Sequence, residues 1–499
     1  MATTGMTETP APGAKAEPAP SVLNPSVAKN MAMVVAGKVV AVIAGIAVTV
    51  LTTRHLGPED YGRYREVLNY VIFGSVLVDL GLYMTLLREL GKPGSHARYF
   101  GAAMALRLVA TGAALFLAAV AGLFLLDDPV VRTGMFVGAL YFTVYQASEL
   151  LIAVFQRHLR QDRQVMAEMA GSAALIALTV LAVALDGGAL AMLAALVGSA
   201  ALTLAIAWRW AALLEPFRLV ADPAIWRNLV IEGLPFAGSR ILLIVILRGD
   251  MLVMALTQSS RALGLYGIPT KVFEIVTSMP PRFSGLLMSN FTEAASRRDF
   301  ALLSRNVGEA VSVMLWFGAG VVITTTVFAE DIVVLIGGNV FVDAGAAMVL
   351  IGPAMALSAI TSVFRFALAA VERQRQLLLL DGAAAIFAFG LFWLLIPIHS
   401  GAGAAVARTL VEAFILCGVA VMAYRAGIRM PLARKLAGAA LAGVLGAGAM
   451  YELSELTGQW WLGFLLGGLV YCVIALIVGL LPGRRTLSWL RARLARTRV

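Results

Sequence analysis

Fourteen long apolar runs occupy most of the sequence, and they constrain the fold more than any other feature. Each run is long enough to cross a bilayer as an α-helix, which satisfies its own backbone hydrogen bonds in hydrocarbon. Because 60% of the 499 residues are hydrophobic and only 14% are charged, a soluble domain is excluded. We predict an all-α polytopic membrane protein with about 14 transmembrane helices. The predicted spans are 31–53, 65–87, 101–126, 133–156, 165–185, 189–208, 233–256, 264–290, 309–329, 344–370, 377–397, 402–424, 436–452 and 460–482.

Two related halves are predicted from the connections and from a short repeat. The longest inner connection separates the first six spans from the next six. Leu56-Gly57 and Tyr61-Gly62, after the first span, recur as Leu263-Gly264 and Tyr266-Gly267 after the seventh. Internal repeats of this kind build many transporters. The predicted division is a disordered cytoplasmic tail at 1–30, an N-terminal six-helix bundle at 31–208, a cytoplasmic connector at 209–232, a C-terminal six-helix bundle at 233–424, helices 13 and 14 at 436–482, and a basic cytoplasmic tail at 483–499.

Basic residues are distributed unequally between the two sides of the predicted bundle. Of the 39 lysines and arginines, 26 fall in the N-terminal segment and every second connection after it, whereas 5 fall in the remaining connections. Lys and Arg concentrate in cytoplasmic loops, so both termini are predicted to be cytoplasmic. The last arginines alternate with Leu487, Leu490 and Leu494, a pattern that favours a helix on the anionic inner leaflet over a disordered basic tail.

A polar stretch, Arg54 to Tyr70, joins the first two spans on the outer side. Gly57 and Pro58 are predicted to end the first helix, and Glu59 and Asp60 to cap the next. Membrane glycosyltransferases that use polyprenyl donors also place acids in this loop. Those enzymes need a large outer loop or domain, and the outer connections here are short, so capping is the favoured interpretation.

Ionisable residues inside the apolar runs are costly in hydrocarbon and normally face a cavity or a partner. Lys271 and Glu274 are three residues apart and can pair on one helical face, as can Arg408 and Glu412, four apart. Arg248 and Asp250 are two apart and need partners from other helices. Arg365 and Asp381 read as a structural pair near the inner surface. The cations predicted to line a substrate cavity are Lys38, Arg240, Arg248, Lys271 and Arg408, and the predicted coupling or pairing acids are Asp79, Glu149, Glu168, Asp250, Glu274 and Glu412.

Cations at several depths of the bundle favour a cavity for an anionic substrate, phosphate above all, because guanidinium groups match phosphate geometry. The sequence contains no P-loop or Gly-rich nucleotide motif. Its two cysteines lie in apolar runs, and its four histidines lack a second ligand at metal spacing. We expect a transporter with no catalytic residues, no metal, no cofactor and no nucleic-acid partner, driven by H+, Na+ or the membrane potential.

Several short motifs occur along the chain. They are Arg54-His-Leu-Gly-Pro-Glu-Asp-Tyr-Gly62 followed by Asp79-Leu-Gly-Leu82, Gly233-Leu-Pro235, Leu263-Gly-Leu-Tyr-Gly267 with Lys271, and Gly401 to Ala407 before Glu412. Together they resemble the polysaccharide-export (Wzx-type) flippases of the multidrug/oligosaccharidyl-lipid/polysaccharide exporter superfamily. The resemblance implies two six-helix bundles around a central cationic cavity. Related peptidoglycan-precursor flippases carry basic residues in helices 1, 2 and 8. Lys38 matches helix 1 and Lys271 with Glu274 matches helix 8, whereas helix 2 offers only Arg63 and Arg65 at its outer end.

The sequence therefore predicts a multi-pass flippase of the bacterial inner membrane that moves a polyprenyl-pyrophosphate-linked oligosaccharide, a polysaccharide repeat unit, by alternating access. Its expected partners are the lipid-linked glycan, the bilayer and, in polysaccharide or lipopolysaccharide biosynthesis, a polymerase and a chain-length regulator. A cation-coupled multidrug exporter of the same superfamily is the first alternative and would need an acid-dominated cavity. A membrane glycosyltransferase is the second.

Overall fold

The computed structural model describes residues 25–79, 82–90, 96–158, 160–430 and 432–477, and within these ranges every regular element is helical. Ten of the helices are long and apolar enough to cross a membrane, which confirms a polytopic membrane protein. Most of the two predicted tails lies outside the described residues; the segment 25–30 is the start of α1. The elements are α1 (Pro25–Asp79), α2 (Leu82–Leu90), α3 (Ala97–Leu125), α4 (Pro129–Arg157), α5 (Gln161–Ala184), α6 (Ala189–Leu214), α7 (Pro223–Thr257), α8 (Ser260–Thr277), α9 (Pro280–Leu286), α10 (Met288–Ser296), α11 (Phe300–Val327), α12 (Ala329–Gly337), the 3-10 helix η1 (Asn339–Ala344), α13 (Gly345–Ala370), α14 (Gln374–Arg425), α15 (Leu432–Thr457) and α16 (Trp460–Ile477).

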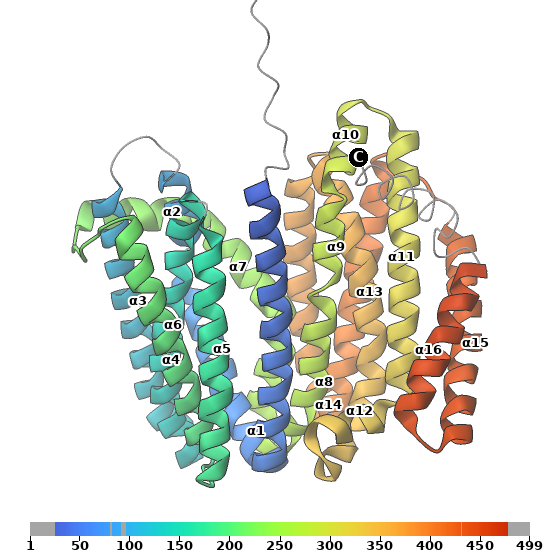
Figure 1. Cartoon of the computed structure of the whole chain (residues 1–499), viewed down its shortest axis with the longest axis horizontal. Helices are drawn as coiled ribbons and strands as arrows, with labels where there is room; N and C mark the ends of the chain where they lie inside the picture. Colours follow the sequence, from blue (N-terminus) through green and yellow to red (C-terminus); the bar gives the residue numbers. More distant parts are fainter. Residues whose placement is uncertain (1–24, 80–81, 91–95, 159, 431, 478–499) are drawn as a thin grey trace, which may run out of the picture.

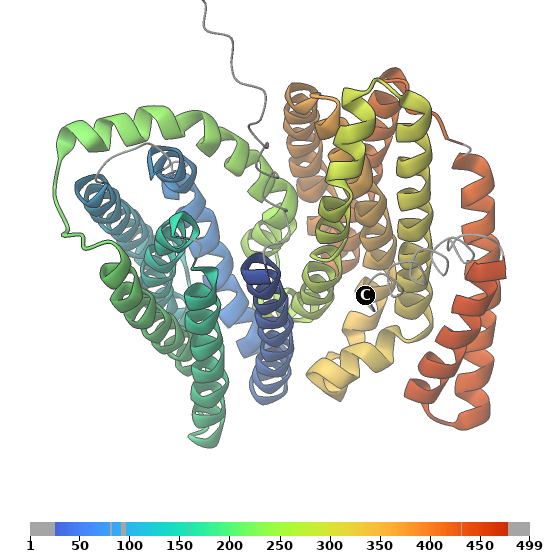
Figure 2. The same ribbon diagram turned by 45° about the horizontal axis from the view of Figure 1, so that its top comes forward.

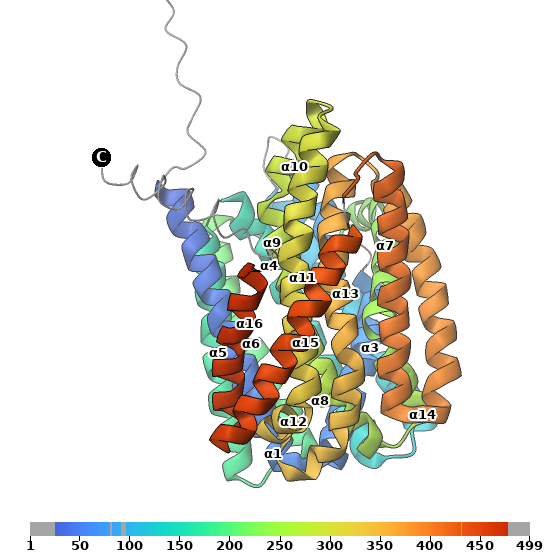
Figure 3. The same cartoon turned by 90° about the vertical axis from the view of Figure 1, so that its right-hand side faces the viewer.

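The helices form two groups, which we call the N-lobe (α1–α6) and the C-lobe (α8–α14), and α7 connects them (Figure 1). Figure 2 shows the first part of α7 lying across the end of the N-lobe before the helix turns toward the C-lobe. Trp226 holds this part through a hydrogen bond from its indole N–H to the Ala102 carbonyl at 2.8 Å, and Arg98 pairs with Asp222 at 2.7 Å. The remaining pair, α15 and α16, packs beside α11 (Figure 3).

The predicted end of the first helix at Gly57 and Pro58 is confirmed, because α1 consists of two helices that meet at a break at Gly57, the kink of α1. Gly57 alone departs from helical geometry, at φ 69° and ψ 178°, and α1 resumes at Pro58, which has no N–H to leave unpaired. Glu59 and Asp60 do not cap the resumed helix; they pair with Arg63 at 2.9 and 2.6 Å. A second kink, at Ser400, divides α14. We call the end of the bundle that holds Gly57 the kink end, and the end that holds the α6–α7 connection the connector end.

Arg63 also ties α1 to the start of α4. Its Nε donates to Asp128 Oδ2 at 2.7 Å, while Asp128 Oδ1 caps α4 by accepting from the Val130 N–H at 2.7 Å. Burial raises the pKa of Asp128, but the hydrogen bonds from Arg63 and from two backbone N–H groups outweigh it, so the pKa lies below its usual value. Asp128 therefore remains an anion, and through Arg63 it holds the part of α1 after Gly57 against the start of α4.

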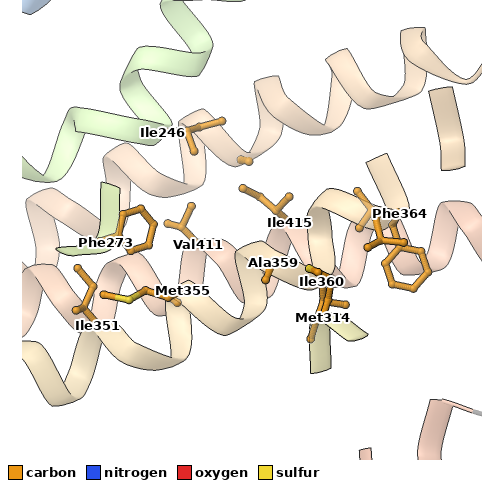
Figure 4. Packing of buried hydrophobic residues seen from close by; sticks show 14 of the residues in the cluster. Ile246, Phe273, Met314, Ile351, Met355, Ala359, Ile360, Phe364, Val411 and Ile415 are labelled. Carbon is orange, nitrogen blue, oxygen red and sulfur yellow. The ribbon is translucent and has the colours of Figure 1, made fainter. Parts of the chain in front are cut away.

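The C-lobe is held by a hydrophobic core that runs along α7, α8, α11, α13 and α14 (Figure 4). Ile351 and Met355 of α13 are fully buried, and Phe273 of α8 and Val411 of α14 pack in the same cluster. Small residues such as Ala359 let the helices approach closely, as membrane helix packing requires. This core fixes the positions of the charged side chains on α7, α8 and α14.

The lobes meet closely at the kink end, where the two copies of the sequence repeat face each other. A Cβ on Gly62 would lie 1.7 Å from the Ser260 carbonyl oxygen, and one on Gly264 would lie 1.8 Å from that of Pro58. Gly267 lies against the ring of Tyr61 in the same way, because a Cβ on Gly267 would lie 2.8 Å from Tyr61 Cε1. Glycine is thus required in both copies because each copy is pressed against the backbone or ring of the other lobe.

Candidate functional site

A cavity of about 200 Å³ lies between the lobes and is lined by α1, α4, α6, α7 and α8. Three cations, Arg65, Arg248 and Lys271, surround one carboxylate, Glu274. Arg248 Nη1 lies 2.6 Å and Arg65 Nη2 3.8 Å from Glu274 Oε1, and Lys271 Nζ lies 3.5 Å from Oε2. The described charges around this central cavity therefore sum to an excess of positive charge.

The pairing of Lys271 with Glu274, predicted from their spacing, is confirmed. So is the prediction that Arg248 and Asp250 find partners on other helices, since Arg248 pairs with Glu274 of α8 and Asp250 accepts a hydrogen bond of 2.9 Å from Tyr266. Both results follow from helix geometry, in which residues three apart share a face and residues two apart do not.

Arg65 is the site residue that the sequence interpretation missed. Its place at the start of the predicted span 65–87 assigns it to the outer end of the second helix. In the structure α1 resumes at Pro58, so Arg65 lies two turns inside the helix and is 6% exposed. The polar series Tyr61, Arg65 and Asn69, at a spacing of four, was the available signal, because it places three polar side chains on one helical face.

Two donors at this cavity have no acceptor among the described residues. They are Arg65 Nε and Asn69 Nδ2, and both side chains are more than nine-tenths buried. A buried donor without an acceptor costs free energy, and an oxygen-rich ligand in this cavity would supply acceptors to both. Hydroxyl groups of Thr49, Thr52 and Tyr141 complete the polar wall.

A second cavity, of about 470 Å³, lies within the C-lobe and shares Arg248 and Glu274 with the central cavity. Here Arg408 is almost fully buried and is held by α7: it donates to the carbonyl oxygens of Ile246 and, at 3.2 Å, of Leu247. Its guanidinium lies 4.0 Å from Asp250 and 4.5 Å from the centre of the Phe273 ring.

The predicted pair of Arg408 with Glu412 is wrong, because Arg408 turns to Asp250 of α7 instead. On α7, Arg408 finds the Asp250 carboxylate and two backbone carbonyl oxygens, whereas the next turn of its own helix offers only the Glu412 carboxylate. Glu412 lines the C-lobe cavity and is 5% exposed. The structural pair of Arg365 with Asp381 is confirmed, with Arg365 Nη1 3.1 Å from Asp381 Oδ2.

The other predicted acids lie elsewhere. Glu149 and Glu168 line a third cavity, of about 260 Å³, within the N-lobe, together with Tyr145 and Ser199. Glu168 accepts a hydrogen bond of 2.7 Å from Gln164. The side chains of Lys38, Asp79 and Arg240 lie outside the described part of the molecule, so their predicted places in the cavity stay predictions.

Comparison with known proteins agrees with this architecture. The model of a family described as polysaccharide biosynthesis protein matches residues 27–281, just over half of the chain. No curated protein matches the sequence.

Among solved structures, the lipid II flippase MurJ in an inward closed conformation is similar, with a TM-score of 0.74, 9% identity and coverage of 90% of this chain and 98% of that one. An inward-facing multidrug resistance MATE family transporter of the MOP superfamily has a TM-score of 0.57 and 14% identity, with coverage of 78% of this chain and 95% of that one. The MATE transporter VcmN of Vibrio cholerae in the bent form has a TM-score of 0.52 and 12% identity, with coverage of 81% of this chain and 98% of that one. The chain therefore belongs to the polysaccharide biosynthesis protein family and has the fold of these transporters.

Proposed function

We propose that the protein is a flippase that carries a polyprenyl-pyrophosphate-linked glycan unit from the inner to the outer leaflet of the bacterial inner membrane. The observation that carries this proposal is the central cavity, where Arg65, Arg248 and Lys271 outnumber Glu274 and where Arg65 Nε and Asn69 Nδ2 lack acceptors. A pyrophosphate supplies negative charge and several acceptor oxygens at once. Family membership supports a role in polysaccharide synthesis.

In this proposal the kink end faces outward and the connector end faces the cytoplasm, as the distribution of basic residues predicts. Ten spans qualify on length and hydropathy, and α1 and α14 each count as one of them. Dividing these two at their kinks gives twelve spans, and adding α7 and α8 gives the proposed fourteen. The close contact of Gly62 with Ser260 seals the outer side in this state. Substrate then enters from the cytoplasmic side and leaves after the lobes part at the kink end.

The driving force we propose is the membrane potential or a gradient of H+ or Na+. Moving one negative charge outward across 100 mV, negative inside, releases about 2.3 kcal/mol. A pyrophosphate carries more than one negative charge, so the potential alone favours the outward direction. In a polysaccharide pathway, the product would be handed to a polymerase and a chain-length regulator.

Purified protein in proteoliposomes with a fluorescent lipid-linked oligosaccharide tests the proposal. We expect the protein to raise the fraction of label that an impermeant quencher reaches from outside, and an imposed potential, negative inside, to speed this step. Protein-free liposomes are the control. If the protein gives no more accessible label than that control, the proposed function is wrong.

The N-lobe cavity motivates one alternative, a cation-coupled multidrug exporter, because its described lining includes the carboxylates Glu149 and Glu168 and no arginine or lysine. Such a pocket suits a cationic drug better than a pyrophosphate. A deletion strain separates the two functions: the flippase predicts loss of surface polysaccharide with unchanged drug sensitivity, and the exporter predicts the reverse.

A further inference from the structure

A basic groove lies at the connector end and shares no lining residue with the central cavity. It is bounded by the first turns of α11, by the connection from α14 to α15 and by the first turn of α15, and its volume is about 740 Å³. Arg305, Arg429 and Lys435 line it against a single acid, Glu309. The remaining wall is largely apolar, with Phe300 and Met430.

The three cations of this groove differ in whether a carboxylate pairs with them. Arg305 pairs with Glu309 at 3.3 Å. Arg429 lies over the ring of Tyr424, 5.6 Å from its centre, and has no carboxylate partner among the described residues. Lys435 Nζ donates to the Gly308 carbonyl at 2.6 Å and to Ser312 Oγ, which leaves one of its three N–H groups for a ligand. Positive charge therefore exceeds negative charge here as well.

The groove is held in shape before any ligand arrives. Ser304 of α11 accepts a hydrogen bond of 2.9 Å from the Arg429 backbone N–H, which ties the connection to α11. Gly427 makes the preceding turn with φ 86°, a conformation that favours glycine, and lies against the Phe300 ring. A fixed shape lowers the ordering cost of binding.

The position of the groove indicates what fills it. Both α11 and α15 are candidate membrane-crossing helices, and the groove is lined by their first turns, so it lies near the level of lipid headgroups. The following turns of α15 present the exposed apolar side chains Leu436, Leu441 and Val444. A free phosphate in water would gain nothing from this surface, whereas the acyl chains of a lipid would cover it.

We propose that this groove binds the phosphodiester headgroup of an anionic phospholipid, with Arg429 and Lys435 on the phosphate and the acyl chains along α15. Basic pockets between membrane helices at the cytoplasmic side recognise acidic lipids in this way. The site is independent of the proposed transport activity, since none of its residues lines the central cavity.

Lipid binding to the full chain in detergent tests this proposal. Native mass spectrometry would give apparent dissociation constants for phosphatidylglycerol and phosphatidylcholine, and a thermal-shift titration with inorganic phosphate would test the free anion. We expect phosphatidylglycerol to bind at least tenfold more tightly than phosphatidylcholine, and inorganic phosphate to give no shift. Equal binding of the two lipids, or a shift with phosphate alone, would overturn the assignment to an anionic lipid.

The double variant Arg429→Gln/Lys435→Gln should lose at least tenfold in affinity for phosphatidylglycerol. Arg297→Gln is the matched control, because Arg297 is an exposed arginine of the same end that pairs with Glu293 outside the groove. If the double variant unfolds, Arg429→Gln alone should still lose at least threefold, since its guanidinium has no carboxylate partner among the described residues and lies over the Tyr424 ring. Wild-type affinity in a folded variant contradicts the site.

Discussion

The central cavity and the C-lobe cavity share a wall, Arg248 with Glu274, yet they use arginine differently. In the C-lobe cavity, Arg408 is held by two carbonyl oxygens and Asp250, and Arg365 by Asp381. In the central cavity three cations share the single carboxylate of Glu274. An Nε without an acceptor among the described residues is common to Arg65 and Arg408, so it does not separate the two cavities. A buried arginine is therefore no evidence of a substrate site until its acceptors are known. We propose that the central cavity binds the substrate and that Arg408 anchors α14 to α7.

The largest expected effect is on folding, at Arg408. Arg408→Met leaves Asp250 buried without its cation, and breaking a buried pair in this way costs about 3–5 kcal/mol. We expect a matching loss in the free energy of unfolding, measured by denaturant titration in detergent. Arg408→Met/Asp250→Asn, which removes both charges, should recover part of it. A stable Arg408→Met protein that no longer flips substrate would move Arg408 into the substrate site.

The next effect is on transport, at Arg65 and Lys271. Arg65→Gln or Lys271→Gln removes a charged donor to pyrophosphate, and a hydrogen bond to a charged group contributes about 1.5–3 kcal/mol. The initial flipping rate at low substrate should therefore fall roughly tenfold or more for each variant. Glu274 keeps two cationic partners in either case, so the unfolding midpoint should stay near that of the wild type. Wild-type rates in both variants would remove the central cavity from the mechanism.

A smaller effect, of opposite sign, is expected at Glu274. Glu274→Gln raises the excess positive charge of the central cavity. A unit charge at roughly 6 Å contributes about 0.7 kcal/mol even at the dielectric constant of water, so polyprenyl pyrophosphate should bind about threefold more tightly or better. Titration of ligand into detergent-solubilised protein measures this change. Weaker binding would mean that Glu274 itself contacts the substrate or that the cations need it for their positions.

The smallest effect is expected at the Arg365–Asp381 pair. Its side chains are 30% and 21% exposed, and pairs that reach solvent contribute about 0–1 kcal/mol. Asp381→Asn should thus change stability by no more than that and leave the flipping rate unchanged. A tenfold loss of rate in this folded variant would show that the C-lobe cavity takes part in transport, and the distinction between the two cavities would fail.

Much of the fold could be predicted because apolar run length reports directly on membrane helices. The break at Gly57 was predictable because a glycine followed by a proline ends a helix, whereas the close approach of Gly62 to Ser260 of the C-lobe was not. The helix α12 was missed because nine residues between two spans were interpreted as a connection.

The candidate site was only partly predictable. Spacing within one helix identified the pair of Lys271 with Glu274, whereas the partners of Arg408 depend on which helix packs beside it. Arg65 was missed because the first position of the predicted span 65–87 was interpreted as the outer end of a helix. A basic residue near a span end belongs to the site when the helix extends beyond the apolar run, and sequence alone does not give that extension.

The most direct test of the central claim compares the affinities of the purified protein for polyprenyl pyrophosphate and for the uncharged polyprenyl alcohol. If the excess charge of the central cavity holds the pyrophosphate, the wild type should bind the pyrophosphate at least tenfold more tightly than the alcohol. In Arg65→Gln/Lys271→Gln this preference should largely disappear while the affinity for the alcohol stays the same. An undiminished preference in that folded double variant would contradict the account.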